Sequence, residues 1–387
     1  MVASLKRSLK WIDRSVGRLG GRRRVLFDVR TPVNAAVLRP LVTALADDPA
    51  IDWRFIVEQQ RRDVFALLER NGWADRLVAR GAARRQRWDL YVNADPWGAP
   101  WLLRCARRMN LFHGVAGKYD LDNPAQLPMG FQYYDRVAFI NEDRMRRYLA
   151  AGIVTREQAV LVGYPKLDAL ARGHYNGAVE RRALGLDCSK PVALYAPTYS
   201  PASSLHLAGE EIVTALLKGG FTVIVKLHDR SLDHDPRYNS GVDWRRRFAL
   251  IREPGFLFAE VDDSSPLLAA ADVMVTDHSS IGFEFLVLDR PLIVFDAPDL
   301  PAAARINPEK IALLRRAADV VRTTSELVAT AHAALAAPGR FSAERREVAS
   351  AIFYRRGGAT ERAMRVAREL LELPTHGIVA SSVTEAA

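Results

Sequence analysis

ADVMVTDHSSIGFEFLVLDRPLIVFD, residues 271–296, contains two short apolar runs separated by a polar turn and a segment of helical length. Val273–Thr276 and Leu292–Phe295 predict buried strands, and Ser280–Asp289 predicts the helix between them. A strand, a helix and a second strand in this order form the βαβ unit of a parallel sheet. The stretch therefore predicts a Rossmann-like α/β domain.

The same alternation of strand and helix runs through most of the chain. A length of 387 residues exceeds what one hydrophobic core usually organises, so two such domains are expected. The helices expected in the first half of the chain are Val37–Ala46, Asp63–Asn71, Trp101–Met109 and Glu142–Ala151. Gly173–Lys190 is the expected connection between the domains. The predicted division is a basic amphipathic helix at 1–24, an N-terminal acceptor domain at 25–172, a C-terminal donor-nucleotide domain with the C-terminal helices at 173–373, and a disordered tail at 374–387.

The N-terminal 24 residues hold eight Lys or Arg against a single Asp, in a chain whose net charge is +10. Leucine, isoleucine and valine recur there at helical spacing, which predicts a basic amphipathic helix. Two interpretations stay open: the helix binds an anionic membrane surface, or it packs on its own domain. The segment lacks interleaved aromatic residues and the rest of the chain is nearly balanced in charge, so nucleic acid is not predicted as a partner.

The composition also excludes several classes. The apolar runs are too short to span a bilayer and the N-terminus lacks the apolar core of a secretory signal, so we expect a cytoplasmic protein, peripheral on the inner face of the membrane if the basic helix binds lipid. Cys105 and Cys188 are far apart and predict neither a disulfide framework nor a thiolate zinc site. The acidic loop at 229–235 resembles a solvated loop more than a metal site. We expect no metal and no cofactor.

The polar turn inside the opening stretch is the first candidate site. Thr276, Asp277, Ser279 and Ser280 follow a strand and precede a helix. Hydroxyl groups and free backbone N–H groups at such a junction suit phosphate oxygens, and the carboxyl edge of a parallel sheet is where open α/β sheets bind ligands. The alternative is simple capping of the helix by a serine.

Three further segments also end predicted strands. His113 and Gly114 follow an N-terminal strand, and Gly117 and Lys118 come next in a turn; a histidine at this place could accept a proton from an attacking hydroxyl. The alternative is a structural histidine beside a glycine turn. Two more segments lie in the C-terminal half, with their candidate residues as follows: Tyr195, Pro197 and Thr198 in YAPTY, and Lys226 and His228 in KLH, whose charge could offset that of a phosphoryl group.

Taken in order, these segments resemble the CDP-glycerol glycerophosphotransferase family of teichoic-acid and capsule synthesis. The resemblance covers about residues 110–300 and rests on HG at His113–Gly114, GYPKLD at Gly163–Asp168, YAPTY at Tyr195–Tyr199, KLH at Lys226–His228 and TDHSSIGFEFLVLDRPLIVFD at Thr276–Asp296. The chain departs from the family pattern at several places: Phe112 precedes HG, Asp229 follows KLH, His278 replaces an aromatic residue, and Glu284 stands where Asp is frequent.

The resemblance implies a GT-B fold, in which two Rossmann-like domains with parallel sheets face a central cleft. It implies that His113 is the general base, that His228 acts with the donor phosphates, and that Ser279 and Ser280 bind the diphosphate. Lys226, Thr198, Thr276, Asp277 and Glu284 join them as expected donor-binding residues, with Gly114, Tyr195 and Pro197 in support.

The expected function is transfer of glycerol phosphate, or a related polyol phosphate, from a CDP-linked donor to a hydroxyl of a lipid-linked glycan or polyol-phosphate acceptor, with release of CMP. Two alternatives stay open. The first is a GT-B glycosyltransferase or sugar-nucleotide 2-epimerase that uses a UDP-sugar. The second is a non-catalytic relative that binds nucleotide or membrane.

Overall fold

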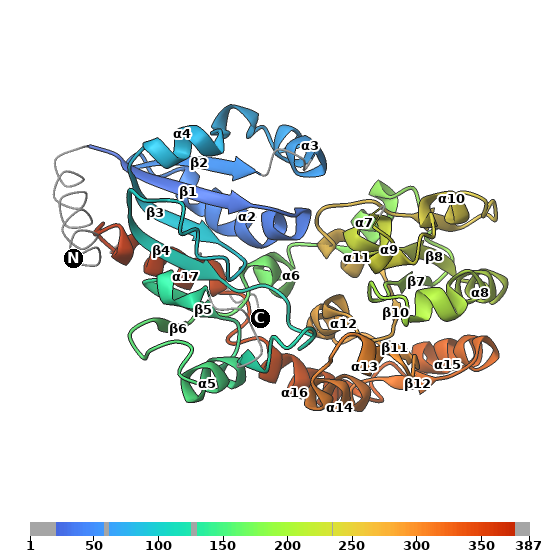
Figure 1. Cartoon of the computed structure of the whole chain (residues 1–387). Helices are drawn as coiled ribbons and strands as arrows, with labels where there is room; N and C mark the ends of the chain where they lie inside the picture. The colour runs from blue at the N-terminus through green and yellow to red at the C-terminus, as the bar shows by residue number, and fades with distance from the viewer. Residues whose placement is uncertain (1–20, 58–61, 125–129, 234, 376–387) are drawn as a thin grey trace, which may run out of the picture. The chain divides into compact units, whose positions relative to one another are not determined.

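The computed structural model describes residues 21–57, 62–124, 130–233 and 235–375, and these form two compact units, each built on its own sheet (Figure 1). Unit 1 comprises residues 1–113, 124–168 and 353–387, and unit 2 comprises residues 114–123 and 169–352. The chain therefore passes between the units more than once. The predicted basic helix falls almost entirely at residues 1–20, outside the described residues.

Unit 1 contains a six-stranded sheet in which every pair of neighbours is parallel. The strand order is β2-β1-β3-β4-β5-β6. Strands β1, β3 and β4 are buried along most of their length, as parallel strands covered on both faces are. The strands are β1 (Arg23–Val29), β2 (Ile51–Val57), β3 (Trp88–Asn93), β4 (Cys105–Leu111), β5 (Arg136–Phe139) and β6 (Ala159–Leu161).

Strand β4 corrects the helix expected at Trp101–Met109. Its sequence, CARRMNL, carries two arginines that would suit the surface of a helix, but both have partners in the segments that precede β4 and β5. Arg107 Nη1 donates to Asp135 Oδ1 at 3.0 Å, and Arg108 Nη2 donates to the carbonyl of Leu102 at 2.6 Å. Tertiary partners thus allow a charged segment to form an inner strand, and local composition cannot foresee that.

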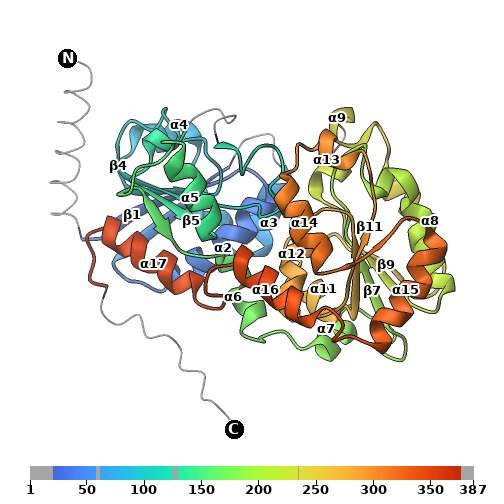
Figure 2. The ribbon, with the colours of Figure 1, turned by 90° about the horizontal axis from the view of Figure 1, so that it is seen from below.

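The helices of unit 1 include one from the far end of the chain. They are α2 (Pro32–Ala46), α3 (Arg62–Arg70), α4 (Arg80–Arg85), α5 (Glu142–Ala150) and α17 (Ala359–Leu370), with 3-10 helices η1 (Ala74–Arg76), η3 (Phe131–Tyr133) and η4 (Pro165–Leu167); α6 (Asp168–Ala171) lies at the junction of the units. Helix α17 contacts α2, and both views draw the two helices close together (Figure 2).

The GYPKLD segment fixes α17 to unit 1. The Asp168 carboxylate accepts the backbone N–H groups of Ala359 at 3.1 Å and Thr360 at 2.6 Å, which satisfies free donors at the start of the helix. Gly163 has φ +90°, and a Cβ there would lie 2.5 Å from the carbonyl oxygen of Tyr354. The C-terminal helix expected in the second domain therefore belongs to unit 1.

Unit 2 repeats the architecture with strand order β12-β11-β10-β7-β8-β9, again with parallel neighbours. The opening stretch provides β10 and β11, the third and second strands of this order, and both occur as the strands that the sequence predicts. The strands are β7 (Val192–Tyr195), β8 (Thr222–Val225), β9 (Phe256–Phe258), β10 (Val273–Thr276), β11 (Leu292–Phe295) and β12 (Asp319–Val321).

Alternate residues of these strands form one continuous core with helices α8 and α15, which contact each other. Ala193 and Tyr195 of β7 and Val273 and Val275 of β10 belong to this core and are fully buried. The helices of unit 2 are α7 (Gly177–Ala183), α8 (Ser204–Lys218), α9 (Pro236–Asn239), α10 (Trp244–Phe248), α11 (Ser265–Ala270), α12 (Ser280–Phe285), α13 (Leu300–Ala303), α14 (Pro308–Arg316), α15 (Thr324–Ala336) and α16 (Ser342–Ile352), with η5 (Asp229–Leu232) and η6 (Leu286–Leu288).

Two smaller expectations also need correction. The connection expected at Gly173–Lys190 contains helix α7, whose Arg181 pairs with Asp272 at 2.5 Å. The helix expected at Ser280–Asp289 is shorter: α12 ends at Phe285 and the 3-10 helix η6 follows. Asp289, at φ +51°, ends η6, and its carboxylate accepts from Arg345 Nε at 2.8 Å. Within the described residues, no helix is both long and apolar enough to cross a membrane.

Candidate active site

Asp277 organises the carboxyl edge of the sheet in unit 2. Its side chain is 3% exposed and accepts four hydrogen bonds. Oδ1 accepts the backbone N–H groups of Thr198 at 2.8 Å and His278 at 2.6 Å; Oδ2 accepts both the N–H and the hydroxyl of Ser204, each at 3.0 Å. This single carboxylate therefore joins the end of β10, the YAPTY segment after β7 and the start of α8.

The YAPTY segment is held from both sides. Tyr195 is fully buried, and its hydroxyl donates to Ser204 Oγ at 2.9 Å, while burial raises its pKa well above the ordinary value. Pro197 is buried beside it and cannot extend the strand's hydrogen bonding. Thr198 Oγ1 donates to the carbonyl of His278 at 2.5 Å, and Thr276 Oγ1 donates to the carbonyl of Ala196 at 2.8 Å. The two threonine protons are thus used inside the protein.

The serine pair begins helix α12. Ser279 is the residue before the helix and its side chain makes no capping hydrogen bond, so the alternative of simple capping by its hydroxyl is not what the structure contains. Ser280 Oγ accepts the N–H of Val115 at 3.4 Å. Glu284 is 3% exposed on the same helix. Helix α12 has six residues, so the phosphate-binding role predicted for the serines rests on their hydroxyls more than on a long helix.

Residues 114–123, which begin at the glycine of the HG motif, belong to unit 2. Gly117 accepts the N–H of Asn307 at 2.9 Å, and the Tyr119 N–H donates to Ala304 at 2.9 Å. The rings of Tyr119 and Tyr199 stack at 5.4 Å between centroids. His278, 5% exposed, is joined to this segment by a 2.8 Å hydrogen bond between Nε2 and the Ala116 carbonyl. Because a carbonyl only accepts, Nε2 carries the proton.

Lys118 is the cation that this segment brings to the carboxyl edge. Its side chain is buried, with Nζ 3.3 Å from Thr198 Oγ1 and 5.4 Å from the centroid of the Tyr199 ring. Burial lowers its pKa to about 8, against the opposing effect of Asp277. The sequence indicated only a flexible turn here, since nothing local predicts that a lysine after two glycines becomes buried.

The KLH segment lies next to the same tyrosine. Lys226 Nζ donates to the Leu227 carbonyl at 2.7 Å and lies 4.0 Å from Asp229 Oδ1. His228 Nδ1 accepts the N–H of Arg230 at 3.1 Å, and its ring lies 4.4 Å from that of Tyr199. The guanidinium carbon of Arg230 lies over the ring of Tyr199, 5.1 Å from its centroid. Cationic side chains from two segments, Lys118 and Arg230, therefore lie over one aromatic ring.

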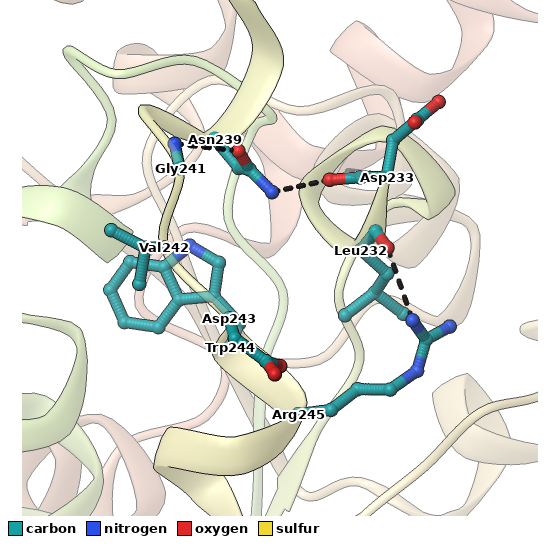
Figure 3. A pocket seen from close by; sticks show the side chains of 8 residues that line it. All are labelled: Leu232, Asp233, Asn239, Gly241, Val242, Asp243, Trp244 and Arg245. Carbon is teal, nitrogen blue, oxygen red and sulfur yellow. Dashed lines mark hydrogen bonds between the residues drawn. The ribbon is translucent and has the colours of Figure 1, made fainter. Parts of the chain in front are cut away.

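A small hollow lies between η5 and α10 and is lined by residues that follow Arg230 in the sequence (Figure 3). Asn239 Nδ2 donates to the carbonyl of Asp233, and Arg245 Nη1 donates to the carbonyl of Leu232 at 3.0 Å, so the two turns are tied across it. Its volume of about 70 Å³ is far below the roughly 300 Å³ of a small-molecule pocket. The hollow is thus too small for a nucleotide in this conformation.

His113 lies in unit 1, two residues after the end of β4, as predicted. Its ring is half-buried; Nδ1 lies 2.6 Å from the carbonyl oxygen of Ala94 and 3.3 Å from Asp95 Oδ1. Since a carbonyl cannot donate, Nδ1 carries the proton and the lone pair of a neutral ring is on Nε2. Nε2 is the atom that can accept a proton, and Asp95 is a partner for the charged ring that the sequence did not identify.

Among the described residues, no group of three or more His, Cys, Asp and Glu side chains is arranged to hold a metal ion. Of the acidic loop considered for that role, His234 lies outside the described residues. Asp235 instead caps α9 through the N–H of Arg237 and pairs with the side chain of that arginine at 2.5 Å.

The family model and the similar sequences agree on one family. The model of the CDP-Glycerol:Poly(glycerophosphate) glycerophosphotransferase family matches residues 132–367, more than half of the chain. The chain is 26% identical over 168 residues to the teichoic acid glycerol-phosphate primase of Bacillus subtilis (strain 168), covering 43% of this chain and 40% of that protein. It is 25% identical over 229 residues to the teichoic acid glycerol-phosphate transferase of Staphylococcus aureus (strain NCTC 8325 / PS 47), covering 50% of this chain and 54% of that protein. The chain thus spans about half of these relatives or less.

Solved structures give the fold. The wall teichoic acid polymerase TagF superposes with a TM-score of 0.64 at 14% identity, covering 96% of both chains. A UDP-GlcNAc 2-epimerase from Neisseria meningitidis, bound to UDP-GlcNAc, gives a TM-score of 0.56 at 12% identity and covers 90% of this chain and 99% of that one. Together with the two parallel sheets, these likenesses confirm the α/β class of GT-B type that the sequence predicts.

Proposed function

Because the chain belongs to the CDP-glycerol:poly(glycerophosphate) glycerophosphotransferase family, we propose that it transfers glycerol phosphate, or a related polyol phosphate, from a CDP-linked donor to an acceptor hydroxyl, with release of CMP. The family match carries this proposal. The site supports it, since unit 2 gathers cations at the carboxyl edge of a parallel sheet, the edge at which α/β sheets bind nucleotides.

In the proposed reaction, the acceptor oxygen attacks the β-phosphorus of the donor. A new O–P bond forms, the bond between the β-phosphorus and the bridging oxygen breaks, and CMP leaves with that oxygen. His113 Nε2 takes the proton of the acceptor hydroxyl. Its Nδ1–H stays bound to the Ala94 carbonyl, and Asp95 offsets the charge of the resulting imidazolium.

The other predicted residues have different roles in this scheme. Lys226, His228, Ser279 and Ser280 bind donor phosphates and stabilise the charge that grows on the leaving group. Thr198, Thr276 and Asp277 hold the loops in place, because their polar atoms are engaged inside the protein. Glu284 supports the turn from α12, and Gly114, Tyr195 and Pro197 shape the two loops.

The acceptor is proposed to be a lipid-linked glycan or polyol phosphate at the inner face of the cytoplasmic membrane. The basic residues of the first 24 positions would bring the enzyme to the anionic surface that carries such an acceptor. This is the proposed reason for the concentration of charge at the N-terminus.

The test is to incubate purified protein with CDP-glycerol and a polyol-phosphate acceptor, and in parallel with UDP-GlcNAc, and to follow nucleotide products by chromatography. We expect CMP from the first mixture and no UDP from the second. UDP formation, or epimerised UDP-sugar, without CMP would contradict the proposal and favour the sugar-nucleotide alternative, to which the fold is also similar. No product from any mixture, with nucleotide binding intact, would favour a non-catalytic relative.

A further inference from the structure

Lys118 has hydrogen-bonding capacity that the protein does not use. Its side chain is 8% exposed, yet the described residues offer its ammonium one hydrogen-bond partner, Thr198 Oγ1 at 3.3 Å. That oxygen gives its own proton to the carbonyl of His278, so it acts toward the lysine as an acceptor. An ammonium has three N–H donors. Two of them therefore lack an acceptor among the described residues.

The nearby acid does not supply the missing partner. Asp277 attracts the ammonium electrostatically, but its two oxygens already accept four hydrogen bonds from Thr198, His278 and Ser204. A buried cation with an incomplete set of partners costs stability. Such an arrangement is expected where a ligand completes it.

Lys310, on α14 of the same unit, provides the contrast. It is 3% exposed, and its Nζ lies 4.0 Å from Asp122 Oδ2, within an ion pair in which both side chains are almost fully buried. That lysine has the partner that a structural role requires. Lys118 is also buried, at 8% exposed, but among the described residues its ammonium contacts only a hydroxyl and an aromatic ring.

The surroundings of Lys118 favour an anion. The guanidinium carbon of Arg230 lies 5.1 Å from the centroid of the Tyr199 ring, and Lys118 Nζ lies 5.4 Å from the same centroid. The arginine charge acts on the lysine as a like charge. Two like charges that converge on one ring repel each other, and an anion of more than one charge placed between them would remove that cost.

We propose that Lys118 binds the diphosphate of the nucleotide donor, with Arg230 as the second cation. This deepens the proposed function, on which it rests for the identity of the donor. It also explains why residues 114–123 belong to unit 2: the chain that carries His113 goes on, five residues later, to supply a phosphate-binding group to the other unit.

The test compares Lys118→Met and Lys118→Gln with the wild type, using CDP and cytidine as probes in isothermal titration calorimetry. Hydrogen bonds to charged groups are worth about 1.5–3 kcal/mol, so CDP affinity should fall by about tenfold or more while cytidine affinity stays the same. Lys218→Met, which removes an exposed lysine from the end of α8, is the matched control and should bind CDP like the wild type. Unchanged CDP affinity in a folded Lys118 variant would overturn the proposal.

Removal of the lysine should also leave the ligand-free melting temperature equal or higher, because a buried charge is lost, while the increase in melting temperature caused by CDP shrinks. If neither variant folds, Arg230→Met, an exposed change, tests the same pair of cations, and unaltered CDP binding in it counts against the shared site. Failure of the proposed function is distinguishable from failure of the Lys118 proposal. If the wild type binds UDP more tightly than CDP, the proposed function is contradicted, and the Lys118 variants are then compared with the wild type using UDP and uridine.

Discussion

The Nε2 atom of His278 donates a 2.8 Å hydrogen bond to the carbonyl oxygen of Ala116, 162 positions earlier in the chain. The bond joins the turn after β10 to the segment that follows the HG motif. Burial keeps the ring neutral by lowering its pKa to about 4. His278, which departs from the family pattern, therefore connects the turn after β10 to the segment after His113.

This contact predicts a pH-dependent stability. The ring resists protonation in the folded state, whereas in the unfolded chain its pKa is near the ordinary histidine value of 6.5. The contribution of the neutral ring to the free energy of unfolding is therefore complete above about pH 6.5. It is lost as the pH falls toward 4, by an amount on the order of 3 kcal/mol. We expect the free energy of unfolding of the wild type to exceed that of His278→Gln by less at pH 5 than at pH 8, as measured by urea denaturation. His174→Gln, at an exposed position, should show no such change, and a constant difference for His278→Gln would contradict the prediction.

Loss of His113 should affect turnover far more than binding. His113→Ala removes the proposed base, and general bases contribute about 10²–10⁴-fold, so kcat should fall within that range while the Kd for CDP-glycerol stays close to that of the wild type. Asp95→Asn keeps the ring and removes only the partner of its charged form, so kcat should fall by less. Steady-state release of CMP and calorimetry measure the two quantities. If the affinity of His113→Ala for CDP-glycerol fell by the same factor as kcat, the residue would bind the donor instead of acting as the base.

Asp277 should be important for stability. Asp277→Asn replaces an oxygen acceptor with an amide donor that faces N–H groups, leaving buried donors without partners at a cost of about 2–4 kcal/mol. Urea unfolding followed by circular dichroism would measure the loss. Glu211→Gln, on the exposed face of α8, serves as the control for removal of a carboxylate and should unfold like the wild type. A fully stable Asp277→Asn variant would mean that the network rearranges without cost.

Asp168 should hold the C-terminal helix on unit 1. Asp168→Ala removes the acceptor of two N–H groups at the start of α17, and losses of this kind cost about 0.5–2 kcal/mol. Limited proteolysis should cut the variant near residue 355 faster than the wild type. Identical cleavage rates would indicate that the packing of α17 on α2 suffices without the cap.

The basic N-terminus should bind anionic lipid. Deletion of residues 2–20 leaves Arg23 and Arg24, which belong to β1, and should lower binding to phosphatidylglycerol vesicles in a sedimentation assay. Vesicles of neutral lipid provide the control, since they lack the surface charge. Equal binding of the full chain and the deletion to anionic vesicles would favour the alternative that this segment packs on its own domain.

Local pattern determined most of the strands. Ile51–Val57, Trp88–Asn93, Val192–Tyr195 and Leu292–Phe295 occur as predicted, because a short apolar run between turns has few uses in an α/β fold other than a buried parallel strand. The sequence also placed His113 and the KLH and YAPTY segments after strands, where parallel topology brings them to a carboxyl edge.

Tertiary structure alone decided which unit each segment joins. Nothing local distinguishes Trp101–Met109 from a helix until the sheet forms and Asp135, 28 positions later, supplies a partner for Arg107. Likewise, the burial of Lys118 depends on Thr198 and Tyr199, eighty positions away, and the position of α17 depends on Asp168. Periodicity reports which face of an element is apolar, whereas hydrogen bonds and ion pairs between distant residues select the surface against which that face packs.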